Sequence, residues 1–289
     1  MEQESPYITV VTGTLNRPQV VLQLIKQLKN VAKTIPLQVI VVDQSTQDNY
    51  VALAEKFPKA SNFMLVHFDK PNTCKYLNFG WQQARAPIVL YLDDDVTITD
   101  TTIQSHIDAY LNPAVRGVAG RVINDGEEVS TDAQVGKILW WGASFTKHFS
   151  YAQQTYVDYP YGCNMSFRRD TLVQVGGFDE RLAPPIYAFN EVDLGYRVSR
   201  RWKHSLVFAP GALVYHHRYP RGGTRNDFEV TEMKQSNNYN YGYFVGKNYN
   251  WVENILFGIR RVPYQIRQEL HTTRDMLKGF MYAKRHHVV

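Results

Sequence analysis

The sequence lacks the features of several protein classes. It has two cysteines, Cys74 and Cys163, among 289 residues, too few for a disulfide framework, so we expect a reduced, cytoplasmic setting. The first ten residues, MEQESPYITV, contain no basic stretch followed by an apolar one, which argues against a signal peptide. No apolar run approaches the roughly 18 residues of a membrane-spanning helix. A hydrophobic content of 44% still allows a sizeable core.

An excess of positive charge is also missing, except near the C-terminus. The chain carries a net charge of +5, and residues 260–289, with seven Lys or Arg and two Asp or Glu, account for all of it. The other 25 basic and 25 acidic residues cancel, and we expect no nucleic-acid partner.

The basic C-terminal segment has the pattern of an amphipathic helix. Its apolar stripe consists of Leu270, Thr273, Leu277, Phe280 and Met281, and the basic residues lie largely off this stripe. Such a helix can lie on an anionic membrane, here at its inner face. Alternatively, it packs on the body of the protein or on a second subunit in a homo-oligomer.

Strands and helices alternate in the first half of the chain. The apolar runs predict strands at 7–11, 37–42, 63–68 and 88–92. Helices are expected at 50–57, at 72–84 and from about residue 17, with Asn16 as a cap. This alternation predicts an α/β fold with a parallel sheet, which binds ligands at the carboxyl ends of its strands. The second half predicts helices at 170–175 and 191–200 and short strands at 206–208 and 213–215.

Three adjacent aspartates follow the apolar run 88–92. Carboxylates this close repel one another, so Asp93, Asp94 and Asp95 indicate a nearby cation, and a divalent metal is the first candidate. A solvated acidic turn is the alternative. Asp43 ends an earlier strand, so its side chain is expected at the same sheet edge.

Two later segments contain residues suited to catalysis. His216 and His217 follow a short predicted strand, and either can join a metal site if the fold brings it near the aspartates. Glu191 and Asp193 open a predicted helix, where acidic residues commonly favour the helix dipole. A carboxylate there could instead act as a general base.

The order and spacing of these segments resemble the family 2 glycosyltransferases, which have the GT-A fold. The resemblance covers roughly residues 7–226. Its segments in order are VVTGTLNRP, VIVVDQST, KYLNFGWQQA, IVLYLDDDV, CNMSFRRDTLVQVGGFDE, FNEVDLGYRV, VYHHR and RGGTR. It implies a GT-A domain over 1–226, with a nucleotide-sugar-binding half at 1–122 and an acceptor and catalytic half at 123–226. A C-terminal helical extension would occupy 227–289.

The resemblance also implies an activity and a set of site residues. A sugar would move from a nucleotide diphosphate, typically UDP, to a hydroxyl of a glycan or a lipid-linked acceptor, with inversion and with Mn²⁺ or Mg²⁺ as cofactor. Asp95 and His216 would hold the metal, with Asp93 converging on them, and Glu191 would be the base. The donor-binding residues would be Thr12, Asp43, Lys75, Asp93, Asp94, Arg221 and Arg225.

The sequence departs from the family pattern at one position, where Asn190 replaces a customary glutamate before Glu191. Asp193 therefore stays open as an alternative base. Val198 stands where processive synthases have glutamine, which favours non-processive transfer.

An inactive nucleotide-binding scaffold and a sugar nucleotidyltransferase are the alternative functions. Trp140, Trp141, Tyr159 and Tyr161 could stack on acceptor sugars or belong to the core.

Overall fold

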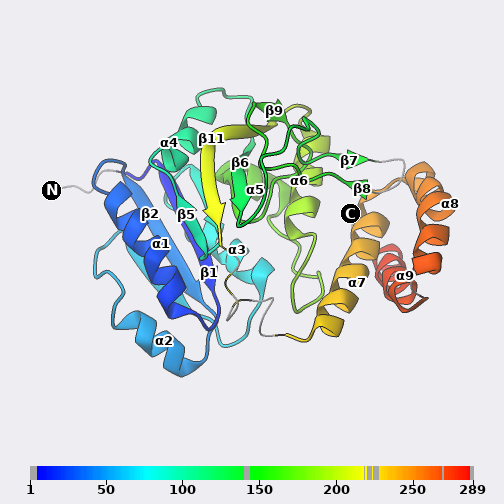
Figure 1. Cartoon of the computed structure of the whole chain (residues 1–289), viewed down its shortest axis with the longest axis horizontal. Coiled ribbons are helices and arrows are strands. Elements are labelled where there is room, and N and C mark those ends of the chain that lie inside the picture. The colour runs from blue at the N-terminus through cyan, green and yellow to red at the C-terminus, as the bar shows by residue number, and fades with distance from the viewer. Residues whose placement is uncertain are drawn as a thin grey trace.

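The computed structural model describes residues 5–139, 144–217, 219, 223, 228–268 and 270–286. Within these ranges it leaves the side chains of 260–262, 264–268 and 270–272 undescribed. A central sheet is flanked by helices, with α1 (Pro18–Val31) and α2 (Gln47–Ala54) at one end of the molecule and α7 (Val230–Asn248), α8 (Trp251–Gln268) and α9 (Leu270–Arg285) at the other (Figure 1). The predicted α/β architecture is confirmed.

The main sheet has the strand order β3-β2-β1-β4-β10-β6-β11-β5, with β9 paired to β11. The strands are β1 (Ile8–Thr14), β2 (Leu37–Asp43), β3 (Phe63–His67), β4 (Ile88–Leu92), β5 (Val96–Ile98), β6 (Gly117–Asn124), β9 (Thr155–Tyr156), β10 (Asn164–Arg168) and β11 (Leu206–His216). A separate two-stranded sheet pairs β7 (Ile138–Leu139) antiparallel with β8 (Ser144–Phe145).

The sheet has a parallel half and a mixed half. Strands β1 to β4 pair in parallel, as the sequence predicts, because each connection between them carries a helix that returns the chain to the same edge. Strand β10 runs antiparallel to both β4 and β6, and β11 is parallel to β6. The carboxyl ends of β1, β2, β4 and β11 carry the residues that the sequence singles out.

The remaining helices connect the strands or lie in the second half of the chain. They are α3 (Thr73–Gln83), α4 (Thr102–Ala109), α5 (Arg169–Val175) and α6 (Asn190–Arg201). The fully buried core includes Val10, Leu24, Val39 and Leu90. Helix α3 lies so close to β1 that a Cβ on Gly80 would collide with the Val11 side chain.

Three local predictions need correction. The helix predicted at 50–57 is α2, which begins and ends three residues earlier. Asn16 does not cap α1: its backbone is left-handed, with a φ of 53°, and its side-chain oxygen accepts hydrogen bonds from Thr46 and Asn49 instead. The two short strands predicted at 206–208 and 213–215 form the single strand β11. The register against β6 shifts between Ala209 and Leu213, and this irregularity absorbs the interruption that Pro210 and Gly211 make in the sequence pattern.

The C-terminal helices pack through small residues. A Cβ on Gly242 of α7 would collide with the backbone of Met276, and a Cβ on Gly279 of α9 would collide with the backbone of Tyr239. Helix α9 therefore packs on α7, while Leu277 and Met281 remain exposed. Among the described residues, no helix is long and apolar enough to cross a membrane.

Candidate active site

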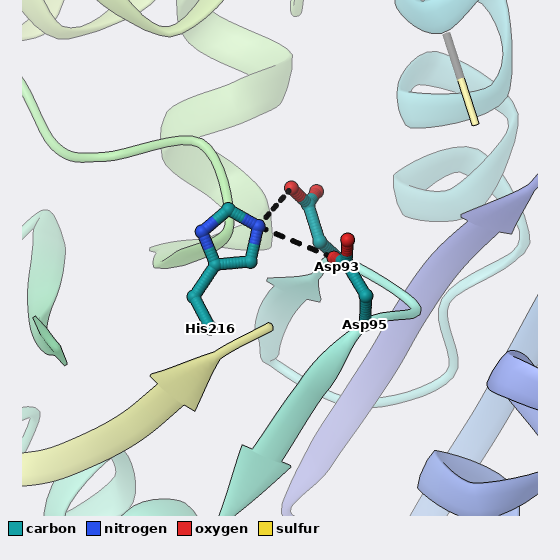
Figure 2. Close-up of side chains that lie close together, drawn as sticks. All are labelled: Asp93, Asp95 and His216. Carbon is teal, nitrogen blue, oxygen red and sulfur yellow. Dashed lines mark ion pairs between the residues drawn. The ribbon is translucent and has the colours of Figure 1, made fainter. Parts of the chain in front are cut away.

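Three side chains expected to converge at the sheet edge do so. Asp93 and Asp95 follow β4, and His216 ends β11 (Figure 2). Nε2 of His216 lies 3.2 Å from Oδ1 of Asp95 and 3.9 Å from Oδ2 of Asp93. One ligand atom from each residue falls within 4.8 Å of the others. Two carboxylates and an imidazole form a donor set that fits Mn²⁺ or Mg²⁺.

The His216 ring is held in the orientation that a metal ligand needs. Its Nδ1 lies 2.8 Å from the side-chain oxygen of Asn124. The Asn124 amide donates to Glu127, which leaves its oxygen to accept from His216. Nδ1 therefore donates to Asn124, and Nε2 faces the two aspartates, where it donates to Asp95 when it is protonated and would offer its lone pair to a bound metal ion.

The middle aspartate of the triplet binds elsewhere. Asp94 accepts a two-pronged hydrogen bond from the Arg17 guanidinium and a 2.6 Å hydrogen bond from Thr14. Arg17 also donates to Oδ2 of Asp95 at 3.0 Å. Asp94 is 2% exposed, so the ion pair is buried. The sequence assigns Asp94 to donor binding, which stays a prediction; in this structure its hydrogen bonds go to the protein.

The electrostatics of the two aspartates differ. Burial raises the pKa of Asp94 to about 6, although Arg17 opposes the shift. Burial acts in the same direction on Asp95, but the His216 hydrogen bond and the charge of Arg17 hold the pKa of Asp95 below its usual range. Asp95 is therefore ionised at neutral pH and ready to bind a cation.

Two predicted donor residues have buried oxygens that the described residues do not satisfy. Thr12 Oγ1 and Asp43 Oδ2 lack a hydrogen-bond partner among them. The other carboxyl oxygen of Asp43 accepts from the Ser45 amide at 2.7 Å. Such groups are costly to bury unpaired and are commonly found at functional sites. Lys75 is exposed in the first turn of α3, which is tied to the end of β2 because the Asn72 amide donates to Gln44.

The two acidic residues at the start of α6 have different environments. Asp193 is 1% exposed and binds Lys247 and Asn248 through Oδ1 and Arg197 through Oδ2. Both of its oxygens are occupied, which leaves no acceptor for a substrate proton. Glu191 is only partly buried, and a Cβ on Gly162 would lie 3.8 Å from its Cδ. The next residue, Cys163, accepts a backbone hydrogen bond from Asp93, so the segment that Glu191 approaches is bonded to the backbone at the start of the aspartate triplet.

Several other predicted residues fall away from this group or outside it. The His217 ring is hydrogen-bonded to Thr97 and Asp125 and not to the metal group, although its backbone amide donates to the carbonyl of Asp95. Tyr159 is a core residue, 4% exposed. Tyr161 presents the edge of its ring to His216, with 6.4 Å between the ring centroids. Arg221, Arg225, Trp140 and Trp141 lie outside the residues that the structure describes.

The sequence analysis missed the residues that orient this site. Arg17, Asn124 and Glu127 belong to no chemical pattern by themselves. Arg17 and Asn124 are also distant in sequence from the groups that they hold, while Glu127 lies three residues from Asn124. Arg17 stands in the NRP segment after β1, which offers the only sequence signal, a basic residue at the carboxyl end of a buried strand.

A sheet edge with an Asp-x-Asp pair and a histidine from a distant strand suits the nucleotide-sugar transferases. The chain is a member of glycosyl transferase family 2, whose family model matches residues 9–176, more than half of the chain. The protein is therefore a glycosyltransferase. This membership removes the support for the nucleotidyltransferase alternative.

A curated relative is the glucosyl-dolichyl phosphate glucuronosyltransferase of Haloferax volcanii. It is 25% identical over 150 residues, which make up 50% of this chain and 46% of the relative. The chain thus matches about half the length of this curated relative.

Solved structures show the same fold at low sequence identity. Staphylococcus aureus TarS 1-349 with UDP-GlcNAc has a TM-score of 0.63 and 14% identity, over 97% of this chain and 82% of that one. GalNAc-T7 with UDP, GalNAc and Mn²⁺ gives 0.59 and 13%, over 98% and 57%. The Pyrobaculum calidifontis mannosyltransferase PcManGT with GDP-Man and Mn²⁺ gives 0.52 and 15%, over 98% and 69%. These likenesses establish the GT-A fold.

We expect Arg17→Met to lower the free energy of unfolding by about 3–5 kcal/mol, because it leaves Asp94 charged and buried without its cation. Urea unfolding measures the loss. The double variant Arg17→Met/Asp94→Asn should recover most of the stability, since it removes both charges. A loss below about 1 kcal/mol in Arg17→Met would show that Asp94 does not depend on this partner.

Proposed function

We propose that the protein is a metal-dependent, inverting, non-processive glycosyltransferase. It moves a sugar from a nucleotide diphosphate, UDP first, to a hydroxyl of a glycan or a lipid-linked saccharide. The observation that carries this proposal is the convergence of Asp93, Asp95 and His216 at one edge of the sheet. Two of the three reported neighbours contain UDP or a UDP-sugar, and two contain Mn²⁺. The name of the curated relative favours a lipid-linked acceptor.

The proposed donor lies along the carboxyl ends of β1, β2 and β4. Thr12 and Asp43 offer their unsatisfied oxygens to the nucleoside, and Lys75 offers a cation to the base or the phosphates. Asp93 and Asp95 with His216 would hold the divalent ion, which when bound neutralises charge that develops on the leaving diphosphate. Arg221 and Arg225 are proposed to add positive charge there.

Glu191 is the proposed general base. It accepts the proton of the acceptor hydroxyl as the oxygen attacks the anomeric carbon opposite the diphosphate. Asp193 is not suited to this task, because its carboxylate is buried and bound by Lys247 and Arg197. The resulting assignment separates a reactive carboxylate from a structural one within a single helical turn.

A donor panel tests the proposal as a whole. UDP-glucose, UDP-glucuronic acid, UDP-GlcNAc and GDP-mannose are each added with Mn²⁺, and both the melting temperature and the release of nucleoside diphosphate are measured. One UDP-sugar should raise the melting temperature and release UDP, because a ligand that binds the folded state stabilises it. A response to GDP-mannose alone would move the donor from UDP to GDP.

Removing a metal ligand should remove the divalent-dependent reaction. Asp95→Ala and His216→Ala should each lower turnover by roughly 10²–10³, the usual cost of losing a group that stabilises charge in the transition state. Nucleoside diphosphate release with and without EDTA measures the effect. His217→Ala is the matched control, since His217 lies outside the metal group, and it should keep its turnover. Unchanged activity of the wild type in EDTA would rule out the metal.

Replacing the base should slow the reaction without releasing the donor. Glu191→Gln keeps the shape of the side chain and removes its basicity, so turnover should fall by roughly 10²–10⁴. UDP affinity, measured by calorimetry with Mn²⁺, should change by less than a few-fold. Asp193→Asn serves as the comparison and should chiefly lower the melting temperature. If Glu191→Gln keeps its turnover while folded Asp193→Asn loses it, Asp193 is the base.

Peripheral membrane contact through the C-terminal helices is part of the proposal. Trp251, Ile255 and Ile259 form an exposed stripe on α8, with Trp251 75% exposed. On α9, Leu277 and Met281 line a groove of about 760 Å³ bordered by Arg274 and Lys278. Apolar residues flanked by positive charge suit an anionic lipid surface.

Vesicle flotation measures that contact. The full chain should float at low salt with vesicles of about equal parts phosphatidylglycerol and phosphatidylcholine, and not with phosphatidylcholine alone, because the attraction needs lipid charge. Trp251→Ser/Ile259→Ser should float less. A wild-type chain that stays with the unbound fraction on both vesicles would exclude this contact.

A further inference from the structure

The first turn of α6, which carries Glu191, is held by a single buried ammonium group from α7. Nζ of Lys247 lies 2.7 Å from Oδ1 of Asp193 and 2.7 Å from Oδ2 of Asp179. The Lys247 side chain is 5% exposed. Asp179 belongs to the turn after α5, so Lys247 joins three segments that are far apart in sequence.

The charges in this cluster are balanced by cations on several sides. Asp193 also binds Arg197, and Asp179 also binds Arg181 and accepts a 2.8 Å hydrogen bond from Tyr243. Burial alone would raise the pKa of both carboxyls, but these partners together with Lys247 hold the pKa of each below its usual range. Both are ionised at neutral pH, and Lys247 is the cation that they share. Without it, two buried carboxylates would lose their common partner.

Aromatic side chains from the same helix hold the residue that precedes α6. Phe189 has a left-handed backbone, with a φ of 72°, which is strained for an aromatic residue. Its ring stacks on Tyr241, with 5.5 Å between centroids and 19° between planes, and on Phe244, with 5.8 Å and 27°. A strained conformation persists when its surroundings fix it, and here α7 supplies those surroundings.

Helix α7 therefore contacts the chain on both sides of Glu191, through Phe189 before it and Asp193 after it. The aromatic contact lies two residues before Glu191, and the Lys247 ion pair lies two residues after it. Both contacts come from a helix beyond residues 9–176, the segment that the family model matches. Figure 1 shows α7 between the α6 region and the outer helices α8 and α9.

We propose that α7 positions Glu191 for catalysis, with Lys247 and Tyr241 as positioning residues that act through the first turn of α6. This inference rests on the proposed role of Glu191 as the base. A base must lie within hydrogen-bond reach of the proton that it removes, so a small shift of this turn slows the reaction without weakening donor binding. The catalytic unit then includes α7 as well as residues 7–226, over which the sequence resembles the family.

The first test separates turnover from donor binding. Lys247→Met should lower kcat for UDP release from the UDP-sugar found in the donor panel by at least tenfold, while calorimetry with UDP and Mn²⁺ shows an affinity within about twofold of wild type. Lys234→Met, an exposed lysine on the same helix, is the matched control and should keep its kcat. A wild-type kcat in folded Lys247→Met overturns the inference.

Tyr241→Leu gives the same test without removing a charge. It deletes the stacking on Phe189 and should also lower kcat by at least tenfold with UDP affinity kept. If Lys247→Met does not fold, this variant decides alone: a lowered kcat with UDP affinity kept supports the inference, and a wild-type kcat overturns it.

A double-variant cycle shows whether Lys247 acts through Glu191. In the Glu191→Gln background, Lys247→Met should lower kcat by less than about twofold more, because there is no longer a base to misplace. A further tenfold loss would mean that Lys247 acts by another route. If Glu191→Gln alone keeps its turnover, the proposed base is wrong, an outcome that differs from failure of Lys247→Met alone.

Discussion

The site depends on how three adjacent carboxylates are kept from repelling one another. Arg17 resolves this problem by binding Asp94 with two of its nitrogens and Asp95 with a third. Asp94 thereby faces the first loop of the chain, and Asp93 and Asp95 face His216. Burial raises the pKa of Asp94 to about 6, which shows that its charge is costly in this place and needs its partner. The ion pair is thus the reason that an Asp-x-Asp pair and not a triplet faces the metal position.

Much of the fold could be predicted from the sequence, because the apolar runs and the helical patterns along the chain are consistent with a single architecture. Fully apolar runs such as 88–92 form central strands, and helices between them enforce parallel pairing and a shared carboxyl edge. The boundaries of α3 and α6 differ from the expected ones by a residue or so. Predictions failed where the local structure depends on tertiary contacts. The Asn16 side chain accepts a hydrogen bond from the loop before α2 and does not cap its own helix. Strand β11 continues through the register shift between Ala209 and Leu213 because it pairs with β6 on both sides of the shift.

The candidate site likewise contains residues that the sequence identifies and residues that only the structure identifies. Asp93, Asp95 and His216 were found because their chemistry and their places at strand ends are visible in sequence. The groups that orient them were not, since Arg17 lies 77 residues from Asp94 and Asn124 lies 92 residues from His216. The choice between Glu191 and Asp193 also needed the structure. Both are acidic residues in one helical turn, and only the cations that surround Asp193 mark it as structural.

Contacts in the structure also indicate a role for the C-terminal helices that their sequence does not. Sequence reasoning treats residues 227–289 as an extension that begins where the family resemblance ends. Yet Asn240 accepts a hydrogen bond from Ala183 and Lys247 neutralises Asp179 and Asp193, so α7 is bonded to the segments on both sides of Glu191. A lysine between two buried aspartates is stable only when all three are in place, because each carboxylate is costly to bury without its cation. The stability of the first turn of α6 is therefore coupled to the packing of α7 against the catalytic half.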